Sequence, residues 1–96
     1  MTGRLPKFTS AAEIVRRRDG NPRGGLTAAG REFWAALFDR DKLPGPFCDE
    51  ADAIVQLLLA EGRIERSVAA MDDSTAEAVG DRIVRFAEEL RQAGLL

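Results

Sequence analysis

The stretch TAAGREFWAALFDR, residues 27 to 40, carries the pattern that decides the fold. Its large apolar side chains recur at intervals of three and four residues, and charged side chains occupy the other positions of the helical wheel. This pattern predicts an amphipathic α-helix of about four turns, which must end before the sequence LPGP at residues 43 to 46. The large apolar residues are Phe33, Trp34, Leu37 and Phe38.

Two further amphipathic helices are predicted on the C-terminal side of this stretch. One begins after Pro46 and continues to Met71, with a kink expected at Gly62 because glycine weakens a helix interior. The other begins at Ser74, where Ser-Thr-Ala-Glu has the spacing of a capping box, and Gly94 is expected to end it. Their apolar stripes include Ile54, Leu58, Ile83, Phe86 and Leu90.

The N-terminal third is predicted to be less regular. Residues 1 to 9 contain a glycine and a proline and show no apolar periodicity, so we expect a flexible basic arm. Ser10 opens a Ser-Ala-Ala-Glu capping box, which predicts a short helix from Ser10 to about Arg18. The sequence DGNPRGG, residues 19 to 25, predicts a turn.

No segment shows the sustained alternation typical of a β-strand, so the predicted fold class is all-α. It consists of one short N-terminal helix and three longer amphipathic helices, the last two forming an antiparallel hairpin, in a single helical domain over residues 10 to 96. A chain of 96 residues buries only a little over ~60% of its unfolded surface. Because the apolar stripes are also narrow, we expect a homo-oligomer.

Enzymatic activity is not expected from the residue types present. The chain has no histidine, and its one cysteine, Cys48, lies beside two acidic residues that oppose a thiolate, so neither a zinc site nor a nucleophile is indicated. Acidic residues occur as adjacent pairs such as Asp72 and Asp73, which helix capping explains. The GNPRGG sequence lacks the spacing of a phosphate-binding glycine loop. We therefore expect no catalytic residue, no metal and no cofactor.

The sequence also predicts a cytoplasmic protein without a membrane partner. The longest strongly apolar stretch, AIVQLLLA at residues 53 to 60, is far shorter than the ~18 residues that a membrane span requires. The N-terminus lacks the apolar core of an export signal.

Charge is unevenly distributed along the chain. Residues 1 to 31 hold seven basic side chains against two acidic ones, a balance of +5, and the remaining residues have a balance of −7. Arg16, Arg17 and Arg18 would splay over about 200° of a helix, and together with Arg4 and Lys7 they could contact phosphates along a broad track. About six such contacts would give a slope near −5 for log K against log salt. The alternative is a solvated helix face and a charged tail.

The N-terminal motifs follow an order that resembles one family of phage terminase small subunits. A Gly-Arg-x-Pro-Lys-x-Thr opening is followed by a short helix, a Gly-Asn-Pro turn and a Leu-x-x-x-Gly-Arg-x-x-Trp helix, and the final Leu-x-x-x-Gly-Leu at residues 90 to 95 is also similar. The matching N-terminal residues are Gly3, Arg4, Pro6, Lys7, Thr9, Gly20, Asn21, Pro22, Leu26, Gly30, Arg31 and Trp34.

This resemblance implies a non-catalytic, ring-forming packaging factor in an infected or lysogenic bacterium. Such a factor binds viral double-stranded DNA and regulates the terminase large subunit, which carries the ATPase and the nuclease. The DNA-binding candidates are then Arg4, Lys7, Arg16, Arg17, Arg18, Arg23 and Arg31. Trp34 is either a ring contact or, as we prefer, part of the core beside Phe38. The residues expected at the oligomer interface or in the core are Phe33, Trp34, Leu37, Phe38, Ile54, Leu58, Ile83, Phe86 and Leu90.

Two other functions remain open from the sequence. Residues 14 to 33 are similar to the wing and following helix of MarR-type winged-helix regulators, an interpretation that requires a β-hairpin across residues 14 to 27. A helical phage adaptor that binds a host or virion protein without DNA would also suit an acidic body with apolar helix faces. Light scattering and DNA binding across salt concentrations separate these hypotheses.

Overall fold

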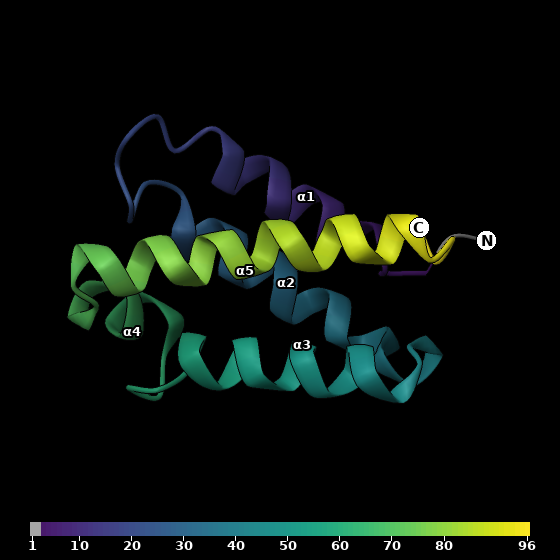
Figure 1. The fold of residues 1–96 in the computed structure, drawn as a ribbon. Coiled ribbons are helices and arrows are strands. Elements are labelled where there is room, and N and C mark those ends of the chain that lie inside the picture. Colours follow the sequence, from purple (N-terminus) through teal and green to yellow (C-terminus); the bar gives the residue numbers. More distant parts are fainter. Residues whose placement is uncertain (1–2) are drawn as a thin grey trace.

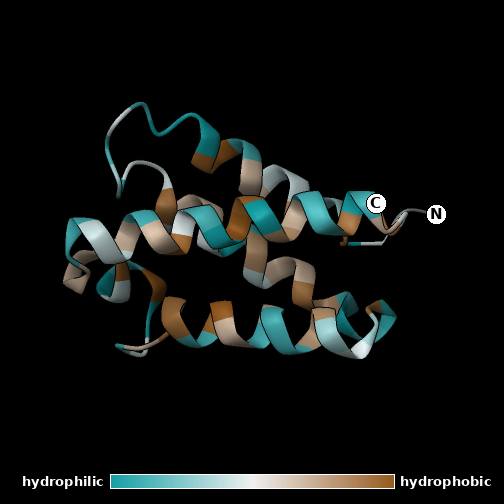
Figure 2. Ribbon diagram, viewed as in Figure 1, coloured by the Kyte–Doolittle hydropathy of each residue, from teal (hydrophilic) through white to brown (hydrophobic). Residues whose placement is uncertain are grey.

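The computed structural model describes residues 3 to 96, and within this range it contains helices and no strands (Figure 1). The all-α prediction is therefore confirmed. Along the ribbon, brown and teal positions alternate as expected of amphipathic helices (Figure 2). The elements are α1 (Pro6–Arg16), α2 (Leu26–Ala36), the 3-10 helix η1 (Leu37–Lys42), α3 (Gly45–Leu58), α4 (Ile64–Ala70) and α5 (Asp73–Gln92).

The long helix α5 packs against three of the other helices, α1, α2 and α3. It contacts α1 on one side and α3 on the other, and α1 in turn packs extensively on α2 (Figure 1). Burying the apolar stripe of α5 removes it from water, which is the main favourable term in holding these helices together. The buried stripe of α5 comprises Ala76, Val79, Gly80, Ile83, Phe86, Ala87 and Leu90.

Four phenylalanines from four helices meet at the centre of the core. Phe8 of α1 packs edge-on against Phe33 of α2 and Phe86 of α5, with ring centroids 4.9 and 5.0 Å apart. Phe47 of α3 approaches Phe86 at 6.0 Å. Phe8, Phe33 and Phe86 are at most 1% exposed. Edge-to-face contacts of this kind add to the burial of apolar area, so this cluster fixes how the helices meet.

The first helix begins earlier than the sequence pattern predicts. Residues 1 and 2 of the predicted arm lie outside the described residues, but α1 starts at Pro6, and Leu5 precedes it without a side-chain cap. Ser10 therefore lies inside the helix, and its predicted capping role is wrong. Proline at the first helical position fixes a suitable φ, and the helix forms because one face of it is buried. That buried face comprises Phe8, Ala11, Ala12 and Val15.

The helix predicted from Pro46 to Met71 is two helices in the structure. Because Gly62 adopts a φ of +86°, the backbone turns between α3 and α4 where only a kink was expected. The Ser67 hydroxyl accepts a hydrogen bond from the Glu61 amide at 2.9 Å and donates to the Arg63 carbonyl at 2.7 Å, which closes the turn. Because α4 follows α3 and precedes α5 along the chain, α3 and α5 are not consecutive helices. The antiparallel hairpin predicted for the last two helices is therefore not confirmed.

The last helix is capped by a different residue from the one predicted. Asp72, and not Ser74, precedes α5 and accepts a hydrogen bond from the Thr75 amide at 2.7 Å. That bond lowers the pKa of the Asp72 carboxyl below its ordinary value. At the other end, Gly94 has a φ of +77° and the Leu95 amide donates to the Leu90 carbonyl at 2.9 Å, which confirms the predicted glycine C-cap.

The helix expected from residue 27 also differs at its C-terminal end. Regular α-helix ends at Ala36 and continues as the tighter η1, within which Asp39 leaves helical geometry. Among residues 3 to 96, no helix is long and apolar enough to cross a membrane.

Candidate functional site

The residues predicted for the core or an oligomer interface divide into two groups. Six of them are at most 1% exposed and form the core: Phe33, Ile54, Leu58, Ile83, Phe86 and Leu90. Trp34 and Phe38 are instead 50% and 69% exposed, and Leu37 is half-buried.

The preferred placement of Trp34 in the core is therefore wrong. Successive residues of an α-helix are rotated by about 100°, so Trp34 points away from the buried face that includes its neighbour Phe33. We call Trp34, Leu37 and Phe38 the aromatic surface.

Two hollows flank Trp34 on this side of the molecule. A shallow one of about 180 Å³ lies among the three residues of the aromatic surface. A larger groove of about 450 Å³ begins at Trp34 and continues to the turn between α3 and α4. The groove is lined mainly by apolar atoms, with two guanidinium groups and a carboxylate at its edge. Its lining residues are Arg31, Trp34, Leu59, Gly62, Arg63, Ile64 and Glu65.

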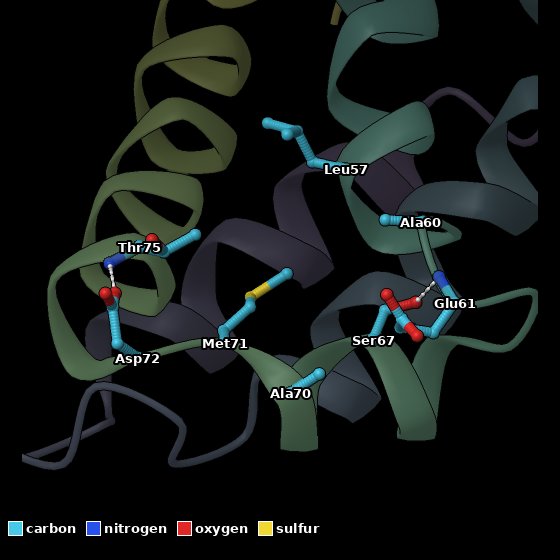
Figure 3. Close-up of a pocket in the computed structure, with 8 residues that line it drawn as sticks. All are labelled: Leu57, Ala60, Glu61, Ser67, Ala70, Met71, Asp72 and Thr75. Carbon is cyan, nitrogen blue, oxygen red and sulfur yellow. Dashed lines mark hydrogen bonds between the residues drawn. The ribbon is translucent and has the colours of Figure 1, made fainter.

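A third hollow, of about 310 Å³, lies where α3, α4 and α5 come together (Figure 3). Its two main polar groups are already used in the fold, since Ser67 is bonded to the Glu61 amide and Asp72 caps α5. Figure 3 shows these bonds at separate sides of the hollow, with apolar side chains such as Leu57 and Met71 between them. Both of these polar groups thus serve the backbone turns at the edge of the hollow.

Most of the predicted DNA-binding side chains form ion pairs with acidic side chains of the same chain. Arg16 of α1 pairs with Glu88 at 2.9 Å, and Arg18 pairs with Asp81 at 2.8 Å, both across to α5. Lys7 lies 3.3 Å from a carboxylate oxygen of Glu32. The positive balance of the N-terminal third is thus compensated locally by carboxylates, which sequence position alone does not reveal.

Arg23 is placed by the fold at the junction between α4 and α5. Its Nε donates to the Met71 carbonyl at 3.1 Å, and its other guanidinium nitrogens contact the same carbonyl and Asp73. A cation beside the last carbonyls of a helix is favourable because those carbonyls have no helical partner. Arg23 therefore ties the turn after α1 to the start of α5.

Arg31 and Arg4 lie near the aromatic surface. Arg31 pairs with Glu65 of α4, and this hydrogen bond lowers the pKa of the Glu65 carboxyl. The Arg4 guanidinium lies 4.6 Å from the centre of the Phe38 ring, within range of a cation–π interaction, and its backbone amide bonds to Asp39.

Arg17 is exposed and, like Arg4, forms no ion pair within the described part of the chain. The seven candidates therefore do not form one uninterrupted basic face. Arg16, Arg17 and Arg18 lie together at the end of α1, whereas Arg4 and Arg31 are at the aromatic surface.

The winged-helix interpretation of the sequence can be checked against the structure of residues 14 to 27. The β-hairpin across residues 14 to 27 that a winged-helix protein requires is not formed, because these residues belong to α1, to turns and to α2. The winged-helix interpretation is therefore wrong.

Cys48 is half-buried in the first turn of α3, and its thiol lies 3.0 Å from the Arg40 carbonyl, a contact that joins α3 to η1. Across residues 3 to 96, no three His, Cys, Asp or Glu side chains gather as a metal site would require.

Comparison of the chain with models of known protein families, with curated proteins and with solved structures finds no match.

Proposed function

We propose that this chain is a non-catalytic DNA-packaging factor of the terminase small-subunit type. It would self-associate, bind viral double-stranded DNA and regulate a large subunit that carries the ATPase and nuclease. The observation that carries the proposal is the order of motifs over residues 3 to 34. In the structure this segment is one unit, with α1 and α2 packed on each other and joined by the Gly-Asn-Pro turn.

The glycine in the tryptophan helix has a packing role that supports treating the motif as one unit. A Cβ at Gly30 would lie 3.0 Å from Ile64 and 3.2 Å from Leu58, so α2 approaches α3 and α4 closely at this point. One helical turn later, Trp34 is exposed. The Leu-x-x-x-Gly-Arg-x-x-Trp spacing thus buries Leu26, allows close helix contact at Gly30 and presents Trp34 on the surface.

Self-association is assigned to the aromatic surface in this proposal. Exposed aromatic side chains that lie beside a groove are typical of protein interfaces, where tryptophan often contributes most of the binding energy. Trp34 separates the groove from the protruding Phe38, so a second copy could place its own aromatic side chain in the groove.

DNA contact is assigned to the end of α1. The ion pairs of Arg16 and Arg18 are partly exposed, and such pairs are worth only a few tenths to about 1 kcal/mol, so DNA phosphates can compete with the carboxylates. Because a carboxylate must first be displaced from the arginine, each such phosphate contact contributes less binding free energy than a contact made by a free arginine. We therefore expect a salt slope shallower than the −5 estimated from about six free cations.

Multi-angle light scattering and fluorescence anisotropy with a short labelled DNA duplex test the proposal together. We expect an oligomer, and DNA binding that weakens steeply as salt rises. Arg17→Glu should weaken binding several-fold, whereas Arg66→Glu, an equal charge reversal at an exposed arginine of α4, should weaken it less. A monomer that binds no DNA at low salt contradicts the proposal.

A helical adaptor without DNA binding is the second candidate. The specific observation in its favour is that five of the seven predicted DNA-binding side chains are already paired with carboxylates. Such a protein would use the aromatic surface for a host or virion protein. Absence of DNA binding in wild type and in charge variants alike would favour the adaptor.

A further inference from the structure

Three ion pairs form a row along the contact between the N-terminal segment and α5. Their basic members come from the end of α1 and the following turn, and their acidic members all come from α5. We call this row the ionic seam. It consists of Arg16–Glu88 at 2.9 Å, Arg18–Asp81 at 2.8 Å and Arg23–Asp73 at 2.7 Å.

The acidic members are spread along much of α5. Asp73, Asp81 and Glu88 are eight and seven residues apart, which at 1.5 Å per residue separates neighbouring carboxylates by about 10 to 12 Å along the helix axis. The seam therefore extends along much of the length of α5. DNA phosphates that approach Arg16 or Arg18 come close to the carboxylates already paired with these arginines, and like charges repel.

Arg18 is held in the seam at a cost to its own hydrogen bonding. Its guanidinium lies over Gly80, where a Cβ would collide with Nη1 and approach Val15 to 3.0 Å. Nη1 is buried there and has no hydrogen-bond partner among residues 3 to 96. A buried donor without a partner is unfavourable. Arg18 therefore regains hydration or a new partner if it leaves Asp81, which makes this pair easier to exchange than its distance suggests.

Carboxylates and phosphates are recognised by arginine in the same way. Both present two oxygens to the planar fork of a guanidinium, in bonds of similar length. Asp81 and Glu88 thus occupy the positions on Arg18 and Arg16 that two phosphate oxygens of a nucleic acid would take.

We propose that the carboxylates of α5 act as an internal phosphate mimic that restrains DNA binding at the end of α1. This inference rests on the proposed DNA-binding function and adds its regulation. In the closed arrangement, Arg16 and Arg18 are paired within the chain and only Arg17 is free for a phosphate. When DNA binds, phosphates replace Asp81 and Glu88, and the displaced carboxylates become hydrated.

The direct test is the double variant Asp81→Asn/Glu88→Gln, with a chemically matched control. Asp49→Asn/Glu89→Gln removes the same two charges from exposed side chains, neither of which forms an ion pair in the described part of the chain. Both variants have the same net charge. A difference between them therefore reports the release of the arginines, and not the general reduction of negative charge.

The readout is anisotropy of a labelled duplex titrated with the full chain at several salt concentrations. We expect the seam variant to bind about threefold to thirtyfold more tightly than the control at low salt, the range that follows from the strength of exposed ion pairs. Its slope of log K against log salt should also be steeper, because no displaced carboxylate attracts cations back when the phosphates bind. Circular dichroism of both variants verifies that they are folded.

If wild type binds DNA and the seam variant binds no more tightly than the control, the inference is overturned and the proposed function stands. If no protein in the series binds DNA at low salt, the proposed function fails, and the inference with it. If the double variant does not fold, the single variant Glu88→Gln is compared with the single variant Glu89→Gln instead. Both members of the Arg16–Glu88 pair are about half exposed, so losing this pair should not unfold the protein. Equal affinity of these two single variants overturns the inference.

Discussion

The ionic seam and the aromatic surface differ in whether their side chains have partners within the chain. In the seam, charged groups that favour water are matched within the chain, and each cation has a carboxylate 2.7 to 2.9 Å away. In the aromatic surface, Trp34 and Phe38, which water disfavours, remain 50% and 69% exposed. Covering apolar area gains about 25 cal/mol per Å², whereas exchanging one hydrated charge partner for another gains little. In the proposed function, this difference assigns affinity for a second copy to the aromatic surface and restraint of DNA binding to the ionic seam.

Phe8→Ala should have the largest effect on folding, because Phe8 is what holds the seam's helix α1 to the core. Removing a fully buried phenylalanine costs about 3 to 5 kcal/mol, so the free energy of unfolding in urea should fall by that amount. A change below about 1 kcal/mol would mean that α1 is held mainly by its ion pairs. The ionic seam would then be a main source of stability, contrary to the comparison above.

Trp34→Ala/Phe38→Ala should separate association from folding. We expect the dissociation constant of the oligomer to rise by a factor of about 30 or more, since buried aromatic anchors at interfaces are typically worth at least 2 kcal/mol. The unfolding free energy of the separated subunit should change by less than about 1 kcal/mol, because both side chains are exposed. Light scattering over a dilution series measures the first quantity, with Leu96→Ala as a control at an exposed apolar residue elsewhere. An unchanged dissociation constant would show that the subunits associate through a surface other than the aromatic surface.

Asp72→Ala should lower the Tm at neutral pH through loss of the α5 cap. The pKa of the Asp72 carboxyl is lowered from its ordinary value of 3.8 by the bond to the Thr75 amide, so its contribution is present above pH 3.8 and is lost as the pH falls through the folded-state value. The Tm difference between wild type and variant should therefore narrow on acidification below pH 3.8. A difference independent of pH would show that the charge has no part in the cap.

Arg16→Met should have the smallest effect on folding. The Arg16–Glu88 pair is about half exposed on both sides, so its loss should change the free energy of unfolding by less than about 1 kcal/mol. Thermal or urea unfolding measures this. A loss above about 2 kcal/mol would show that the seam is a structural clamp, and would remove the contrast with the aromatic surface.

The all-α fold and most of the core were predictable from the sequence because apolar periodicity reports which face of a helix is buried. Ile54, Leu58, Ile83, Phe86 and Leu90 lie where their spacing placed them. Helix boundaries were less predictable. Ser10 has the spacing of a cap, yet burial of Phe8 two residues earlier extends α1 to Pro6, because tertiary packing outweighs a local capping preference.

The candidate site was less predictable than the fold. The basic residues were identifiable by type, but their partners Asp81 and Glu88 are more than 60 positions away in sequence, at 63 and 72 residues. Only the packing of α1 on α5 brings them together. Trp34 was also hard to place, since it shares an apolar run with Phe33. The two differ only in their angle on the helix and in that no element among residues 3 to 96 covers Trp34.

The place of Trp34 also makes the protein its own optical probe. The chain has one tryptophan and no tyrosine, so emission excited at the red edge of protein absorption comes from the aromatic surface alone. A half-exposed indole emits at long wavelength and shifts toward the blue when it is covered. Stopped-flow measurement of that shift would time the arrival of whatever covers this surface, without a label and without interference from the core phenylalanines.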